Sequence, residues 1–329
     1  MTASVRDPPS GAGGRDRRLP RALPATVSLV IIAVAGAVLW RALDSIEFAD
    51  VARGFNAIPA ANVALAALLT VSACLAVAAY EAAMLRYLQS GLPDRLSVLT
   101  ALTAFPIGHA VGFGALSGGA VRYRFYSAAG LSAFSIGKVV VLSVFPFAMG
   151  LGLLCGLAFL IRSADGARLL TLDARWVVLV GGALILLHAA YLTLVLRVRG
   201  PVTLRGFELE LPTPRLTAIQ YLLGMVEVLA AAGVLYVLLP ESAGVAFLPF
   251  VAVYVIAIVA GLLSSVPAGL GVFESVLLLM LRDLDPETLL GSVLAYRLIY
   301  ELAPFTLAIT LLLGCEAWSR RHLLGRRRS

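Results

Sequence analysis

The sequence has 329 residues, of which 60% are hydrophobic and only 14% charged, with a mean hydropathy of +0.94. Soluble domains carry roughly 25% charged residues, and apolar runs near the roughly 20 residues that cross a bilayer recur along this chain. The composition excludes an ordinary soluble domain and predicts an all-α, polytopic membrane helix bundle. The net charge of +7 is almost entirely arginine in short loops and tails. That distribution is typical of membrane orientation signals, so we expect no nucleic-acid partner.

The apolar runs predict seven regular membrane spans. They cover residues 25–43, 60–80, 136–161, 176–196, 216–239, 247–265 and 291–315. The first run could pass for a signal peptide, but the many later spans favour an uncleaved first span. Residues 1–24 are predicted to be a disordered cytoplasmic tail, residues 25–318 a single transmembrane domain, and residues 319–329 a basic cytoplasmic tail. The loops are too short for a soluble catalytic domain.

Two further apolar segments are interrupted by proline and glycine. Segment 97–116 contains Pro106 and three glycines, and segment 266–281 begins Val266-Pro267-Ala268-Gly269-Leu270-Gly271. A broken helix at membrane depth exposes backbone groups that lipid cannot satisfy, so it must be buried in protein or line a wet cavity. One broken or re-entrant segment in each half of the chain indicates a substrate site between the halves. A kink with only a packing role is the alternative.

The arginine pattern also predicts how these segments run. Arginines flank segment 97–116 on both sides, so we expect it to enter from the cytoplasm and return. The loop 282–290 is mostly acidic and is predicted to lie outside. Segment 266–281 would then cross the membrane as a short broken span.

An arginine motif follows the first broken segment. It reads Ser117-Gly118-Gly119-Ala120-Val121-Arg122-Tyr123-Arg124-Phe125-Tyr126. The glycines allow a ligand to approach the backbone closely, and the forked guanidinium donors suit a phosphate. A positive anchor at the membrane interface, with interfacial aromatics, is the alternative.

Three glutamates are candidates for binding a cationic group. Glu227 lies near the centre of span 216–239, where a charge costs at least about 2.5–3.5 kcal/mol, so it should face a polar cavity, pair with a cation or be protonated. Glu81 and Glu274 have simpler alternatives, a solvated helix end and a helix cap respectively.

The last span contains a charged pair four residues apart. Either Arg297 and Glu301 neutralise each other, or Arg297 is free for a lipid phosphate. His109 is expected to pack between helices. The three cysteines lie in apolar runs and no metal-ligand spacing or nucleophile–base set occurs in the sequence, so we expect no metal and no cofactor.

Three motifs together resemble the transmembrane region of the lysylphosphatidylglycerol synthase family, the MprF group. The first runs from Ser117 through Tyr126 to Gly130-Leu131-Ser132, the second from Val266 to Glu274, and the third comprises Tyr296, Arg297, Tyr300 and Pro304. Their order and spacing agree across about residues 25–318. The chain departs from the family at Ala268, where glycine is common, and at Glu301, where an uncharged residue is more usual.

The resemblance implies a flippase-like protein that moves aminoacylated phosphatidylglycerol, or a related phospholipid, between leaflets of the bacterial cytoplasmic membrane, with both termini cytoplasmic. The chain lacks the soluble aminoacyl-transfer domain of bifunctional members, so no enzymatic activity is expected. The resemblance and the charges assign three groups of residues. They are Arg122, Arg124 and Arg297 for the phosphate; Glu227, Glu81 and Glu274 for a cationic headgroup; and Ser117, Gly118, Gly119, Pro267, Gly269 and Gly271 for backbone contacts.

Other functions remain open at this point. A non-transporting subunit could dock a separate lipid-modifying synthase through its arginine-rich loops. A lipid-modifying enzyme and a proton-coupled solute transporter are further alternatives, and a second copy of the chain is a further candidate partner.

Overall fold

A computed structural model describes residues 58–111, 114–170, 172–198, 202–204, 207–209, 211–240, 243–264 and 266–325. The predicted tail 1–24, the predicted span 25–43 and the last residues of the predicted tail 319–329 lie outside the described residues.

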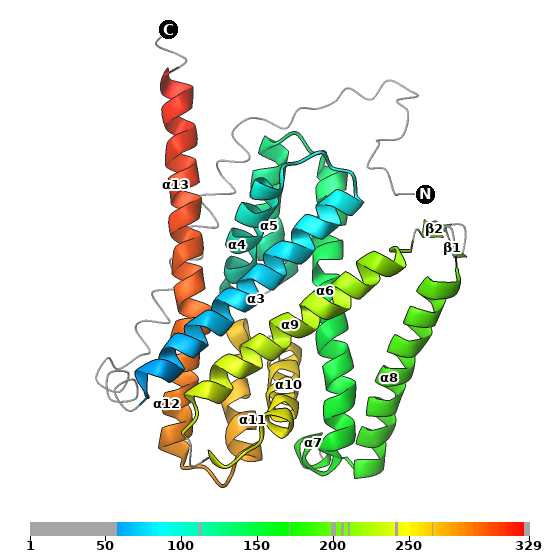
Figure 1. Cartoon of the computed structure of the whole chain (residues 1–329), viewed down its shortest axis with the longest axis vertical. Coiled ribbons are helices and arrows are strands. Elements are labelled where there is room, and N and C mark those ends of the chain that lie inside the picture. The colour runs from blue at the N-terminus through cyan, green and yellow to red at the C-terminus, as the bar shows by residue number, and fades with distance from the viewer. Residues whose placement is uncertain are drawn as a thin grey trace.

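The described residues form a helix bundle with one small β-hairpin (Figure 1). The α-helices are α3 (Ala60–Tyr87), α4 (Asp94–Val111), α5 (Gly114–Ala128), α6 (Ala133–Ile161), α7 (Ser163–Leu170), α8 (Ala174–Arg197), α9 (Pro214–Leu238), α10 (Phe247–Leu263), α11 (Val272–Met280), α12 (Pro286–Tyr296) and α13 (Ala303–Gly325). A 3-10 turn, η2 (Pro267–Gly269), precedes α11, and a π-helical segment, η3 (Arg297–Leu302), joins α12 to α13. Strands β1 (Val202–Leu204) and β2 (Phe207–Leu209) pair antiparallel, with Thr203 opposite Glu208.

The all-α membrane fold is confirmed. Within the described ranges, five helical stretches are long and apolar enough to cross a membrane, namely α3, α6, α8, α9 and the continuous stretch Pro286–Ala317, while α10 is apolar but shorter. Each of the six predicted spans in this part of the chain corresponds to one of these helices. The chain is therefore a multi-pass membrane protein.

Polar side chains fix where several of these helices begin. Ser132, Asp173, Thr213 and Asp285 each accept a hydrogen bond from a backbone amide in the first turn of α6, α8, α9 and α12. Such caps satisfy amides that have no partner within the helix. At Asp285, hydrogen bonds from the amide and hydroxyl of Thr288 lower the pKa of the carboxyl group. The caps therefore define the residues at which these four helices begin.

The first broken segment is a helical hairpin. Helices α4 and α5 pack against each other in one half of the bundle, and α5 begins at Gly114, shortly after α4 ends at Val111 (Figure 1). Both open ends of the hairpin lie at the end of the bundle where α9 begins. The predicted break within 97–116 is confirmed, and the chain returns to the end from which it came.

The second broken segment is also a hairpin, which corrects one prediction. Near the end of α9, the Tyr236 hydroxyl donates a hydrogen bond to the carbonyl of Val245, just before α10 begins. The start of α10 therefore lies beside the end of α9. Helix α12 also contacts the end of α9, since its Ser292 hydroxyl donates a hydrogen bond to the Leu238 carbonyl. The chain from α10 through η2 to α11 therefore enters and returns at one end of the bundle, opposite to the end used by α4 and α5 (Figure 1). The sequence predicted that 247–265 and 266–281 each cross, whereas the turn at η2 sends the chain back.

Two predicted spans also differ in length or regularity. Helix α3 continues to Tyr87, beyond the predicted end at residue 80, because the charge of Glu81 is paired inside the protein. The last span was predicted to be regular, but its hydrogen-bond pattern widens to a π-helix at Arg297–Leu302, just before Pro304. A proline lacks the amide that continues the α-helical pattern, and π-helical turns are often found at functional sites.

Candidate functional site

A cavity of about 400 Å³ lies between the two hairpins. Gly108 and His109 of α4 line it from the first hairpin, and Val266, Ala268 and Gly269 line it from the second. Helices α3, α6 and α9 and the π-helical segment complete the wall. The volume is within the range of pockets that bind small ligands. The structure thus brings the two broken segments to one cavity, as the sequence predicted.

One edge of the cavity is apolar and exposed. Val144 of α6 is 44% exposed, Leu262 of α10 is 57% exposed and Val266 is 39% exposed, and all three line the cavity. In a membrane protein, exposed apolar side chains on long helices face lipid. The cavity is therefore open sideways toward the acyl chains, while its inner wall carries charged groups.

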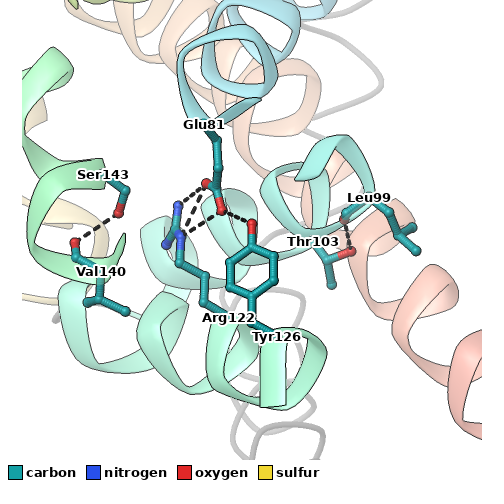
Figure 2. A network of polar contacts seen from close by, with 7 residues as sticks. All are labelled: Glu81, Leu99, Thr103, Arg122, Tyr126, Val140 and Ser143. Carbon is teal, nitrogen blue, oxygen red and sulfur yellow. Dashed lines mark hydrogen bonds and ion pairs between the residues drawn. The ribbon is translucent and has the colours of Figure 1, made fainter. Parts of the chain in front are cut away.

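The inner wall contains a buried ion pair between the first hairpin and α3 (Figure 2). Arg122 donates from Nη2 to Oε2 of Glu81 at 2.6 Å and from Nε to Oε1 at 3.1 Å, and the Tyr126 hydroxyl donates to Oε1 at 2.6 Å. Glu81 is fully buried and Arg122 is 6% exposed. Glu81 is thus not a solvated helix end, and it satisfies Arg122 through only one side of the guanidinium group.

Small residues place Arg122 in this position. A Cβ atom on Gly118 would lie 2.9 Å from the Ala104 carbonyl oxygen of α4 and 3.2 Å from Nη1 of Arg122. The first of these distances is one that real Cβ atoms essentially never show, so the hairpin can close only with glycine here. The predicted glycine motif therefore serves helix packing in the described structure.

Glu227 is the unpaired charge of the cavity. It is 1% exposed, lines the cavity from α9, and neither oxygen of its carboxyl group makes a hydrogen bond within the described part of the chain. The Tyr80 hydroxyl lies close enough to Glu227 to be a potential donor to it, but the two groups do not meet the distance and angle of a hydrogen bond. A buried carboxylate without a partner is strongly unfavourable, so this position calls for a cation or a proton.

A second cluster of charges lies at the second hairpin. Arg297 donates from Nε to Oε1 of Glu274 at 2.7 Å and from Nη1 to Oε2 of Glu301 at 2.9 Å. Glu274 also accepts from the Gly271 amide at 2.8 Å, which caps α11. The pairing of Arg297 with Glu301 and the capping role of Glu274, both alternatives in the sequence, are present in the structure. Two carboxylates share one arginine here, and of the three residues only Glu301 lines the cavity.

A row of aromatic rings runs from α4 of the first hairpin to Phe273 beside Arg297. The rings of Phe105, His109, Tyr300, Tyr296 and Phe273 follow one another with neighbouring centroids 5.3 to 6.4 Å apart. The Tyr296 and Tyr254 hydroxyls are hydrogen-bonded at 2.8 Å. Aromatic faces beside carboxylates attract cations. His109 packs between helices as expected, and it also lines the cavity.

The remaining sequence candidates have separate positions. Arg124 forms an ion pair with Glu316 of α13 at 2.8 Å and does not line the cavity. Of the twelve predicted site residues, the cavity wall contains Arg122, Glu227 and Gly269, with Glu81 directly behind Arg122. Sequence reasoning missed Tyr80 and Ser143 in the wall and named Tyr296 only as part of the third motif, because only the packing of their helices brings these residues together.

Ala268 adopts a backbone conformation that favours glycine, with φ 53° and ψ 15°. The left-handed region costs an L-residue roughly 1–2 kcal/mol. We therefore expect Ala268→Gly to raise the free energy of unfolding in detergent by about 1 kcal/mol, after allowance for the extra freedom of glycine in the unfolded chain. Ala260, which lies within helix α10, is the matched control. Ala260→Gly should lower the free energy of unfolding by about 1 kcal/mol. Equal losses in both variants would contradict the prediction.

Comparison with known proteins gives an uncharacterized protein and an inner membrane protein as relatives over most of the chain's length. An uncharacterized protein of Synechocystis, slr0712, is 28% identical over 289 residues, which cover 88% of this chain and 90% of the relative. The inner membrane protein YbhN of Escherichia coli is 27% identical over 204 residues, which cover 61% of this chain and 64% of YbhN. No family model matches the chain.

A shorter similarity extends to an enzyme. Phosphatidylglycerol lysyltransferase of Staphylococcus aureus is 40% identical over 93 residues, which cover 27% of this chain and 11% of the enzyme. The chain thus matches less than two thirds of YbhN and about a tenth of the lysyltransferase. The match to YbhN agrees with the apolar helices in indicating a multi-pass protein of the bacterial inner membrane.

Proposed function

We propose that this protein is a membrane lipid translocase that takes a phospholipid with a cationic headgroup into the cavity between its two hairpins. The proposal rests on Glu227. Its buried carboxyl group has no hydrogen-bond partner among the described residues, and it lines a cavity that is open sideways to lipid. The similarity to a phosphatidylglycerol lysyltransferase supports lysyl-phosphatidylglycerol as the lipid to test first.

The cavity offers a place for each part of such a lipid. Glu227 and Glu301 would attract the ammonium groups, and the neighbouring aromatic rings would add cation–π attraction. Arg122 would hold the phosphate through Nη1, which is not part of its fork with Glu81. The acyl chains would stay in the bilayer beside Val144 and Leu262.

The two hairpins support movement between leaflets. They enter from opposite ends of the bundle and meet at the cavity, and each is tied to a long helix by a charged contact, Arg122 to Glu81 of α3 and Glu274 to Arg297 at the start of η3. Opposed broken helices around a central site are typical of proteins that expose a site alternately to two sides. The bacterial inner membrane is the proposed location, with the arginine-rich connections in the cytoplasm.

Transport can be tested in liposomes that contain lysyl-phosphatidylglycerol and the purified protein. A membrane-impermeant amine reagent reports how fast this lipid reaches the outer leaflet. We expect wild-type protein to accelerate the movement and Glu227→Gln to slow it at least about tenfold, since a buried charged contact with the ligand would be lost. The exposed residue Glu287 provides the matched control, and Glu287→Gln should equal wild type.

Two outcomes would contradict the proposal. Equal rates for wild type and Glu227→Gln would remove Glu227 from the site. No movement by the chain alone, with movement restored by a co-purifying synthase, would favour the docking subunit that the sequence left open.

A further inference from the structure

The charges around the cavity are unbalanced. Four carboxyl groups, those of Glu81, Glu227, Glu274 and Glu301, belong to the two charge clusters and the cavity wall, together with only two guanidinium groups, those of Arg122 and Arg297. Glu81 and Arg122 neutralise each other, and Arg297 is shared by two carboxylates. Glu227 is left with no cation among the described residues.

The groups that face Glu227 cannot neutralise it. From α3 these are Tyr80 and Cys74, from α10 Tyr254, and from η3 Tyr300, all within electrostatic range. Phenols and thiols are neutral near pH 7 unless something favours their anions, and here they would only add negative charge. Helix α6 contributes Ser143 to the cavity wall, which carries no charge.

We propose that Glu227 is a proton-binding site, and that a proton and the cationic headgroup occupy it alternately. Without lipid the carboxyl group holds a proton, because an uncompensated charge at a 1% exposed position is strongly disfavoured. When the ammonium group enters, the O–H bond of the carboxyl breaks, the proton passes to water in the cavity, and the carboxylate pairs with the ammonium. Each lipid bound would therefore release one proton, and transport would exchange lipid for a proton.

The exchange makes a quantitative prediction about binding. Over the pH range in which Glu227 is protonated in the empty protein, the Kd of the lipid should rise about tenfold for each unit by which the pH falls, because proton and headgroup compete.

The test is calorimetry of lysyl-phosphatidylglycerol binding to the whole protein in detergent. Binding heats are compared in two buffers of different ionisation enthalpy, and the difference gives the number of protons released. We expect wild type and the Glu287→Gln control to release about one more proton per lipid bound than Glu227→Gln does. Any proton exchanged by the amines of the lipid is common to all three proteins, so this difference removes it. The pH dependence of the wild-type Kd is a second readout that needs no variant.

This inference rests on the proposed function, but the two fail differently. Binding and translocation of the lipid with no proton release and a flat Kd against pH would overturn the proton site alone. No binding at any pH would overturn the proposed function as well. Release of one proton by both wild type and Glu227→Gln would assign the proton to another group and overturn the inference.

Discussion

Replacement of Glu81 by leucine is expected to lower the free energy of unfolding by about 3–5 kcal/mol, because it leaves the Arg122 guanidinium buried without its partner. The loss has two parts. The hydrogen bonds that Arg122 donates to Glu81 disappear, and the Tyr126 hydroxyl loses its acceptor. A guanidinium cannot give up its proton in a protein, so this charge cannot be removed by titration.

The reverse change should cost less. In Arg122→Leu the Glu81 carboxyl can take a proton and become neutral, and it still accepts from Tyr126. The double variant Glu81→Leu/Arg122→Leu removes both charges, so it should be more stable than Glu81→Leu alone. It should fold and yet fail to move lipid, because the phosphate loses its guanidinium.

Thermal and denaturant unfolding of the four proteins in one detergent checks this order of stabilities. The expected order is wild type first, then Arg122→Leu and the double variant, with Glu81→Leu last. If Glu81→Leu were as stable as wild type, water in the cavity would be solvating Arg122, and the pair would not hold the hairpin to α3.

The sequence identifies Glu81 and Arg122 as candidate site residues, but it does not show that they form a pair. The sequence selected both residues and assigned Glu81 to a cationic headgroup and Arg122 to a phosphate. Each is a charged side chain in or next to an apolar segment, and such a residue can be identified from the neighbouring sequence alone. The two residues are 41 positions apart, and only the structure, in which α4 packs against both α3 and α5, shows that their side chains contact each other.

The broken helices show the same division. Pro106 and the glycines predicted a break in 97–116, and the glycines after Pro267 predicted one at 266–271, and both breaks are present. The direction in which the chain leaves a break depends on turn geometry and on neighbouring helices, which charge counting does not capture. The acidic loop 282–290 led to the prediction of a crossing, which is wrong, because the contacts of α10 and α12 with the end of α9 show a return.

The crossing of α6 and α9 is the second place where a single change should have a large effect. A Cβ atom on Gly224 would lie 1.9 Å from the carbonyl oxygen of Pro146, and a Cβ atom on Gly150 would lie 2.4 Å from the carbonyl carbon of Gly224. Both clashes are with backbone, which cannot rotate away as a side chain can. The two helices are therefore in direct backbone contact at this crossing.

Gly224→Ala must push α9 away from α6, and we expect a loss of about 3 kcal/mol or more in the free energy of unfolding, at the upper end of overpacking effects. Glu227 lies one turn further along α9, so the same shift moves its carboxyl group in the cavity. Transport should therefore fall even at temperatures where the variant is folded, although no side chain of the cavity has been removed.

Gly137 near the start of α6 is the matched control, because it is exposed and a Cβ atom there would meet nothing within 4 Å. Gly137→Ala should be neutral or raise the stability by up to about 1 kcal/mol through helix propensity. Unfolding in detergent and lipid movement in liposomes should both separate the two variants. If Gly224→Ala kept wild-type stability and transport, the close crossing would not determine where Glu227 lies, and the cavity would have to hold its carboxyl by another contact.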